Sequence, residues 1–230
     1  MVSITSLRTA FNRIRLHLAG WGAVAGPEYH HFRNVILPTP RGTTEIDYLI
    51  VSRFGLFVIE FKDRSGQIYG KVLEPYWTAV HFKKHFKFQN PLNQNFGHLK
   101  ALEENLGIEL PRMQSIVVFR WRCQFMTPVP NNVFLQTCSG WLAQRKDVLL
   151  NDKEVEEVLR QLKERAVRGW FAAFNHARSV KRRYASTTTC PKCGGNLIER
   201  VARTGPMPGS RFLGCSNFPS CRYTRNFHAT

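Results

Sequence analysis

Two apolar runs separated by a short break constrain the fold of this sequence more than any other feature. Residues 46–51 and 56–61 are rich in β-branched and aromatic side chains, and residues 52–55, Ser-Arg-Phe-Gly, are typical of a turn. The pattern predicts a β-hairpin with apolar side chains on both faces, so we expect other elements to cover both. One face is expected to carry Ile46, Tyr48, Ile50, Phe57, Ile59 and Phe61; the other carries Leu49, Val51, Leu56 and Val58.

Three charged residues, Asp47, Glu60 and Lys62, are expected at one end of this second face. A two- or four-residue turn would place Asp47 directly opposite Glu60, whereas a three-residue turn would place Asp47 on the wrong face. A divalent metal ion there would relieve the repulsion between the two carboxylates. Charged strand ends are also often merely solvated, and this interpretation stays open for a lone pattern of this kind.

The charge balance indicates a polyanionic partner. The 230 residues contain 33 Lys and Arg against 16 Asp and Glu, a formal net charge of +17. Such an excess favours nucleic acid or an anionic membrane surface, although non-specific binding would have the same composition. We expect nucleic acid as the partner and no membrane association. No run approaches the length of a transmembrane helix.

Four of the six cysteines lie in the last 41 residues with the spacing of metal ligands. Cys190, Cys193, Cys215 and Cys221 follow the pattern C-x2-C-x21-C-x5-C. Four thiolates complete a tetrahedral zinc site and leave no position for water, so we expect a structural zinc ion in a hairpin-built ribbon. Chance clustering or two disulfides are the alternatives. This cysteine usage also indicates a reducing cytoplasm.

The segments before and after the hairpin predict short elements. Residues 6–18 predict an amphipathic helix. The apolar stretch over 16–26 is a poor signal peptide because His17, Trp21 and three glycines interrupt it. Strands are expected over 31–37, 67–70, 77–82, 115–119 and 132–136, and Cys123 is expected to be a packed thiol.

Residues 81–88, HFKKHFKF, alternate rings with cations. This composition suits a nucleic-acid surface, on which bases stack on the rings and phosphates pair with the lysines. An ordinary hairpin whose Phe82, Phe86 and Phe88 face the core fits the pattern equally well.

Two helices are predicted in the second half of the chain. Asn90 and Pro91 open the first, which Gly107 caps, and its apolar face would carry Phe96, Leu99, Leu102 and Leu106. Gln94 and His98 share one face of this helix. The second would run from Asp152 to the basic residues 181–183, before a Ser/Thr linker over 185–189. Its apolar face would carry Val155, Val158, Leu159, Leu162, Ala166, Trp170, Phe171 and Phe174.

The stretch TTEIDYLIVSRFGLFVIEFKDRSGQIYG and the later NPLNQNFGHLKAL resemble the nuclease-related domain called NERD, over residues 25–145. The resemblance implies an α/β fold of the restriction-endonuclease-like type, a mixed sheet flanked by helices. It implies that Asp47 and Glu60 bind Mg²⁺ or Mn²⁺, that Lys62 polarises water or the scissile phosphate, and that Gln94 is the helical glutamine of the site. The sequence departs from the family in one respect, since no acidic residue precedes Glu28.

The tail, CPKCGGNLIERVARTGPMPGSRFLGCSNFPSCRYTRNF, resembles the four-cysteine zinc finger at the C-terminus of bacterial type I topoisomerases, which binds DNA. Residues 186–230 carry six basic side chains against one acidic one. Basic and aromatic residues together suit single-stranded nucleic acid, although so small a module also needs rings for its own core. The candidate contacts are Arg211, Phe212, Phe218, Arg222, Tyr223 and Arg225.

These inferences predict a four-part chain: a helix over 1–24, a NERD-like domain over 25–150, a helical connector over 151–185 and a zinc ribbon over 186–230. The function expected is a metal-dependent DNA nuclease whose finger holds DNA, with single strands as one option. A DNA-binding adaptor with a degenerate nuclease fold, acting in DNA processing or topology, is the main alternative. An RNA- or protein-binding zinc ribbon protein is a third. The expected location is the cytoplasm, with the nucleoid if DNA is bound.

Overall fold

The computed structural model describes residues 21–120, 122–167, 172–192, 195–203, 208–219, 221 and 223–226. The chain divides into two compact units, one of residues 1–38 and 44–167 and one of residues 39–43 and 168–230. The helix predicted over residues 6–18 lies outside the described residues.

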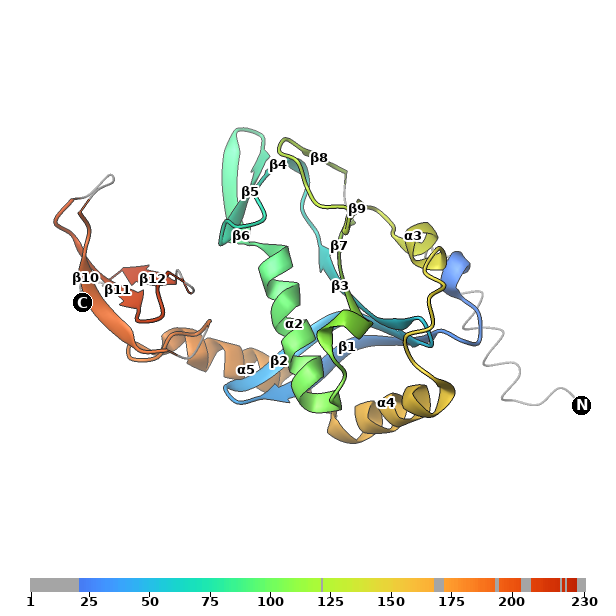
Figure 1. The fold of residues 1–230 in the computed structure, drawn as a ribbon. Coiled ribbons are helices and arrows are strands. Elements are labelled where there is room, and N and C mark those ends of the chain that lie inside the picture. The colour runs from blue at the N-terminus through green and yellow to red at the C-terminus, as the bar shows by residue number, and fades with distance from the viewer. Residues whose placement is uncertain are drawn as a thin grey trace, which may run out of the picture. The chain divides into compact units, whose positions relative to one another are not determined.

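The first unit is built on a five-stranded mixed sheet with the order β1-β2-β3-β7-β9 (Figure 1). Its strands are β1 (His30–Thr39), β2 (Gly42–Ser52), β3 (Gly55–Lys62), β7 (Met113–Phe119) and β9 (Val133–Leu135). β2 and β3 are antiparallel, whereas β7 is parallel to both β3 and β9. The predicted α/β class with a mixed sheet is confirmed.

The central hairpin has the expected register. Its pairs run from Tyr48 opposite Ile59 to Ser52 opposite Gly55, so the turn contains two residues, Arg53 and Phe54. A two-residue turn was one of the two lengths that keep Asp47 on the face of Glu60.

Both faces of the hairpin are buried, as expected. Leu49, Val51, Leu56 and Val58 pack with α2 (Pro91–Leu106) and α4 (Asp152–Arg165), while Tyr48, Ile50, Phe57 and Ile59 pack with η1 (Gly22–Val24) and α3 (Ser139–Ala143). The expectation for Ile46 is wrong, because its side chain packs in the first cluster and not with Tyr48. The β2–β3 ladder ends at Tyr48, so the pairing with β3 does not impose strict alternation on the residues before it.

A second sheet, with the order β6-β5-β4-β8, contains β4 (Gly66–Tyr69), β5 (Tyr76–His81), β6 (Lys84–Gln89) and β8 (Cys123–Phe125). Half-buried Cys123 packs beside this sheet's apolar cluster. Phe88 faces that core and is 8% exposed, whereas Phe82 is 85% and Phe86 46% exposed. The core-facing interpretation therefore holds for Phe88 alone, and the other two rings remain at the surface.

Phe82 occupies a backbone conformation that suits asparagine better. Phe82 and Lys83 form the two-residue turn between β5 and β6, with φ angles of 47° and 61°. Such a turn needs positive φ at both positions, where a β-carbon costs about 1–2 kcal/mol and Asn is tolerated. We expect Phe82→Asn to raise the free energy of unfolding by roughly 0.5–1 kcal/mol, measured by urea denaturation.

A matched control for this substitution is Leu73→Asn. Leu73 is 89% exposed and also lies outside the strands, but it is not among the residues with positive φ. Its replacement is expected to change stability by less than about 0.5 kcal/mol. A loss of stability on Phe82→Asn would show that the ring contributes packing that outweighs the backbone strain.

Helix α2 has the predicted ends. The Asn90 side chain accepts a hydrogen bond from the Leu92 amide at 2.9 Å, and Gly107 ends the helix in the left-handed conformation with φ of 66°. Leu99, Leu102 and Leu106 are buried as expected. Phe96 is 53% exposed, contrary to the expectation, because it lies about 100° around the helix from Asn95, which is in the buried stripe.

The single long helix expected from Asp152 is wrong, because two helices are present. α4 ends at Arg165, where Ala166 turns to an extended conformation with ψ of 127° and the Val167 amide donates to the Ile36 carbonyl. α5 then spans Ala172–Ala185. Residues 168–171 and the side chains of 172–174 lie outside the described part, so the expectations for Trp170, Phe171 and Phe174 have no counterpart here.

The second unit contains α5 and a small antiparallel sheet of β10 (Leu197–Val201), β11 (Arg211–Cys215) and β12 (Thr224–Asn226). The Ser/Thr linker predicted over residues 185–189 is hydrogen-bonded at its start. Arg225 Nη1 donates hydrogen bonds to the carbonyls of Tyr184, Ala185 and Ser186 at 3.0–3.1 Å, which joins β12 to the end of α5.

Candidate functional site

Glu60, near the end of β3, is surrounded by partners from its own strand and from α2. Its side chain is 2% exposed. Lys62 Nζ lies 2.6 Å from Glu60 Oε1, and His98 Nε2 lies 3.1 Å from Glu60 Oε2. Lys62 Nζ also donates to Gln94 Oε1 at 2.9 Å. The structure therefore brings together Glu60, Lys62 and Gln94 as expected from the sequence, and adds His98.

Asp47 reaches the neighbouring strand through its side chain. Its Oδ2 accepts a hydrogen bond from the Phe61 amide at 2.8 Å. Asp47 and Glu60 line the same cavity of about 620 Å³. Two carboxylates from adjacent strands thus border one space at the end of the hairpin.

The environment shifts the pKa values of the two carboxylates in opposite directions. Burial, assisted by the charge of Glu60, raises the pKa of Asp47 above its ordinary value. Burial also opposes ionisation of Glu60, but the hydrogen bond with His98 and the positive charge of Lys62 outweigh it and lower the pKa of Glu60. Glu60 is consequently the more readily ionised of the two, and a cation near Asp47 would favour its charged form.

The wall of this cavity includes residues that the sequence patterns did not single out. Arg120 follows β7, and because β7 runs parallel to β3 with Phe119 opposite Lys62, Arg120 emerges at the same end of the sheet. Arg120 forms a two-bond ion pair with Asp63. A sequence-based prediction that β3 and β7 pair in parallel would have indicated Arg120 as a residue of this cavity. The described lining is Trp21, Arg33, Asn34, Asp47, Tyr48, Glu60, Phe61, Asp63, Arg120, Gln136 and Thr137.

Two lining residues have left-handed backbone conformations. Asn34 within β1 has φ of 51°, and Gln136 after β9 has φ of 67°. Asn34 Nδ2 donates to Glu45 Oε1 at 2.8 Å, and the Gln136 amide donates to the Phe119 carbonyl at 2.7 Å. Residues in this region of φ and ψ are uncommon and cluster at functional sites.

The donors in this cavity fit a hard divalent cation. Asp47 and Glu60 supply carboxylate oxygens, the ligands that Mg²⁺ and Mn²⁺ prefer. Each carboxylate has about four lone-pair positions, so hydrogen bonds to Phe61, Lys62 and His98 leave acceptor capacity on both. Glu28 is exposed and is not among the described lining residues, so it does not replace the missing acidic residue here.

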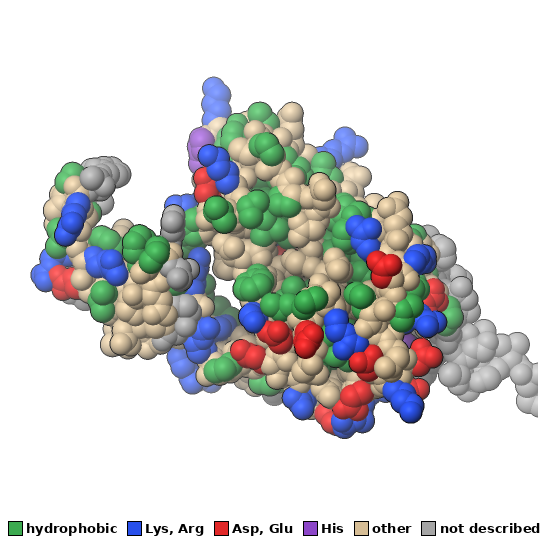
Figure 2. Space-filling model, in the orientation of Figure 1, with side chains coloured by type: hydrophobic (Ala, Val, Ile, Leu, Met, Phe, Trp, Pro, Cys, Tyr) green, Lys and Arg blue, Asp and Glu red, His purple; other side chains and the backbone are tan. Residues whose placement is uncertain are grey.

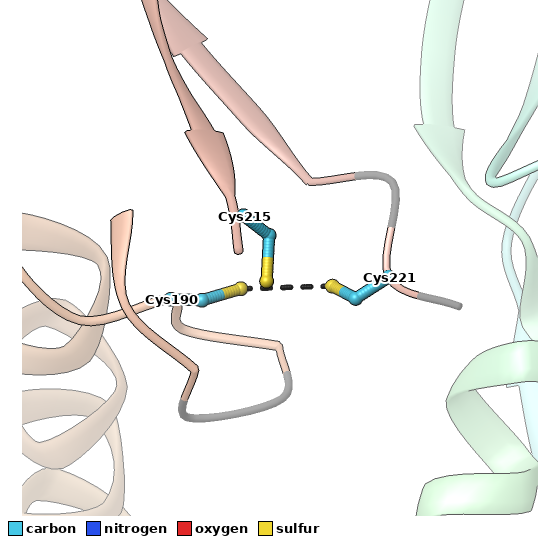
Figure 3. Close-up of side chains that lie close together, drawn as sticks. All are labelled: Cys190, Cys215 and Cys221. Atoms are coloured by element: carbon cyan, nitrogen blue, oxygen red, sulfur yellow. Dashed lines mark hydrogen bonds between the residues drawn. The ribbon is translucent and has the colours of Figure 1, made fainter. Parts of the chain in front are cut away.

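Three cysteine side chains of the second unit converge. The sulfur atoms of Cys190, Cys215 and Cys221 lie within 4.8 Å of one another and point toward a common centre (Figure 3). The Asn217 amide points to Cys215 Sγ at 3.4 Å, as in a metal-binding knuckle. Cys193, the fourth predicted ligand, lies outside the described residues. All three are free thiols, so the described part supports zinc over disulfides.

The finger exposes some of its predicted nucleic-acid contacts and uses others internally. Phe218 is 57% exposed, with the Arg200 guanidinium 5.5 Å from its ring centre. Arg211 is exposed and paired with Glu199, and Phe212 is half-buried.

Tyr223 and Arg225 differ from the expectation. Tyr223 is 7% exposed and packs in the core of the finger, so its ring is not available for base stacking. The Arg225 guanidinium is bonded to the end of α5. Arg222 lies outside the described residues.

Comparison with protein families assigns both parts of the chain. Residues 10–120 match the nuclease-related domain, and residues 187–230 match the topoisomerase DNA-binding C4 zinc finger. The chain carries a NERD domain and a topoisomerase-type zinc finger. The NERD match starts and ends earlier than the range of 25–145 expected from the sequence motifs. Together the two matches indicate a nuclease-related function and DNA binding.

Three curated relatives each match part of this chain. An uncharacterized protein of Bacillus anthracis is 33% identical over 124 residues, which are 48% of this chain and 58% of that protein. DNA topoisomerase 1 of Archaeoglobus fulgidus is 49% identical over 35 residues, 15% of this chain and 5% of the enzyme. The uncharacterized protein YrdD of Escherichia coli is 49% identical over 37 residues, 16% of this chain and 18% of YrdD. The chain thus covers less than two thirds of each.

No solved structure matches this chain. Among the described residues, no helix combines the length and apolar character needed to cross a membrane.

Proposed function

We propose that this protein is a Mg²⁺- or Mn²⁺-dependent DNA nuclease whose zinc finger holds the DNA. The observation that carries the proposal is the cavity bordered by Asp47 and Glu60, in which Glu60 pairs with Lys62 and the Lys62 ammonium donates to Gln94. Two carboxylates beside a lysine are the residues that the NERD resemblance assigns to phosphodiester hydrolysis. The family match supports the same chemistry.

The residues of the site divide the work of hydrolysis. When bound at Asp47 and Glu60, the metal ion would lower the pKa of water and neutralise phosphate charge. Glu60 is held in place by Lys62 and His98, so its carboxylate is positioned before substrate arrives. Gln94 fixes the Lys62 ammonium, which supplies positive charge as a P–O bond breaks and water adds to phosphorus. Arg120 supplies a further cation at the cavity wall.

The direct test is cleavage of plasmid and oligonucleotide DNA by the full chain with Mg²⁺ or Mn²⁺, compared with EDTA. Metal-dependent conversion of supercoiled plasmid or shortening of labelled oligonucleotides is expected. DNA binding without any cleavage under these conditions would overturn the nuclease assignment.

That outcome would favour the second candidate function, a DNA-binding adaptor with a degenerate nuclease site. The observation on its side is the acidic set, since Glu28 is exposed and outside the described cavity lining. Both oxygens of Glu60 also already have partners within the protein, Lys62 Nζ and His98 Nε2.

DNA contacts are proposed on the finger and on the β5–β6 hairpin. The exposed ring of Phe218 beside Arg200 suits a stacked base with a nearby phosphate. On the hairpin, exposed Phe82 lies beside Lys83 and Lys84, and Figure 2 shows Lys, Arg and His side chains over this region. Both surfaces favour single-stranded DNA, because unpaired bases are free to stack.

Deleting residues 186–230 is expected to weaken DNA binding. The deletion removes six basic side chains and one acidic one. Each ion pair with a phosphate that the deletion eliminates lowers the magnitude of the slope of log K against log salt by about 0.9 on duplex DNA or about 0.7 on single strands, so the absence of about two to four such pairs is measurable. Fluorescence anisotropy over a salt series measures both affinity and slope.

Cleavage at saturating DNA should survive this deletion, because Asp47, Glu60 and Lys62 remain. An unchanged affinity and salt slope would instead mean that the finger binds a protein partner.

A further inference from the structure

A second cavity, of about 470 Å³, lies within the second unit and is lined by arginines. One wall is the turn between β1 and β2, with Arg41 and Gly42; the other is one face of α5. The described lining is Arg41, Gly42, Asn175, Arg178, Ser179, Arg182 and Arg183. We call it the arginine pocket. α5 lies between the segments matched by the two families, so neither match assigns a role to its side chains.

The two walls are held together by specific contacts. Gly42 has φ of 125°, a conformation that favours glycine, and a β-carbon at this position would lie 2.1 Å from Ser179 Oγ. Thr43 Oγ1 lies 2.8 Å from His176 Nδ1, and Arg183 Nη2 donates to the Thr43 carbonyl at 2.9 Å. Specific contacts within the second unit therefore hold the two walls of the pocket in place.

The charge of the pocket is not balanced by its own lining. Four guanidinium groups border it, and no acidic side chain is among the described residues that do so. Arg178 and Arg182 are four apart on α5, a spacing at which like charges repel. Arg183 Nε is buried without a hydrogen-bond partner in the described structure, an arrangement that is uncommon for a buried donor. An anion in the pocket would relieve the repulsion and could satisfy the donor.

We propose that the arginine pocket binds a phosphate group of a DNA strand. The planar fork of donors on each guanidinium matches the oxygens of a phosphate, and the volume lies in the range of small-ligand sites. The phosphate can be an internal phosphodiester or a strand terminus, since the recognition chemistry is the same. The choice of DNA as the source of the phosphate rests on the proposed function.

The test compares two neighbouring charges on α5 in the full chain. Arg182→Gln and Lys181→Gln each remove one charge from an exposed residue, but only Arg182 lines the pocket. Affinity is measured by anisotropy over a salt series, on single-stranded oligonucleotides with a 5′-phosphate and with a 5′-hydroxyl. Arg182→Gln is expected to lower the magnitude of the salt slope by about 0.7, and Lys181→Gln by clearly less.

The two oligonucleotides identify the source of the phosphate. An equal loss of affinity on both substrates indicates an internal phosphodiester, and a loss confined to the 5′-phosphorylated one indicates a terminus. Arg182→Lys keeps the charge without the fork and should recover only part of the affinity.

Equal salt slopes for Arg182→Gln and Lys181→Gln would overturn the proposal that the arginine pocket binds a phosphate. If this occurred while wild type still bound and cleaved DNA, the proposed function would stand. Failure of wild type to bind DNA would reject the proposed function itself.

Discussion

Replacing Asp47 with alanine is expected to abolish metal-dependent DNA cleavage while leaving DNA affinity nearly unchanged. Asp47 borders the cavity with Glu60, and its loss removes one of two carboxylates proposed to bind the metal ion. We expect a fall in the cleavage rate of about a hundredfold or more, equivalent to about 2.7 kcal/mol of transition-state stabilisation. Glu60→Ala and Lys62→Ala should have effects of similar size. Single-turnover cleavage of a labelled oligonucleotide measures all three.

The matched control is Asp147→Ala, which removes an exposed carboxylate that does not line the cavity. It should cleave DNA at the wild-type rate. Cleavage by the Asp47, Glu60 and Lys62 variants at rates equal to wild type would rule out this site as the nuclease centre.

Asp47→Asn separates a catalytic role from a structural one. Because the pKa of Asp47 is raised by burial and by Glu60, the neutral carboxyl is the form that the fold favours. Its contribution to stability is present at low pH and is lost as the pH rises through the raised pKa, so ionised Asp47 opposes folding at neutral pH. Without divalent metal, the Tm of Asp47→Asn at pH 7 should therefore be no lower than that of wild type, although cleavage is lost.

Removing zinc is expected to have the second large effect, unfolding the finger. Purified protein should contain about one zinc ion per chain, because four thiolates form a closed tetrahedral site. Cys190→Ser or Cys215→Ser should lose the metal, since each sulfur lies in the cluster. The small core around Leu197 and Tyr223 has little other packing to hold it. Zinc content by atomic emission and near-UV circular dichroism measure the two effects.

Cys123→Ser is the control for this prediction. Cys123 is half-buried beside the second sheet and lies outside the metal cluster, so its replacement should leave zinc content unchanged. Full zinc occupancy in a variant with serine at both Cys190 and Cys193 would show that the ligands lie elsewhere in the chain.

Local sequence patterns were sufficient to predict elements whose determining residues lie close together in the chain. The hairpin follows from two apolar runs around a turn-like break, although the two-residue length of the turn came from the structure. α2 follows from Asn90, Pro91 and Gly107, whose side chains or backbone freedom act within a few residues. The cysteine spacing likewise pointed to a cluster of sulfurs, which the described Cys190, Cys215 and Cys221 form. In each case, the determining interactions span few residues or involve ligands of one type.

Tertiary structure decided the features that depend on partners distant in the chain. α4 ends at Arg165, and the extended Ala166 leads to Val167, whose amide donates to the Ile36 carbonyl in β1; no local signal marks that stop. Arg120 reaches the cavity only through the parallel pairing of β7 with β3. Arg41 and the α5 arginines line one pocket because Gly42 allows the backbone beside Arg41 to approach Ser179 on α5. Helical and strand periodicity describe which side of an element is apolar, but the partner of each polar side chain is determined by how the elements pack.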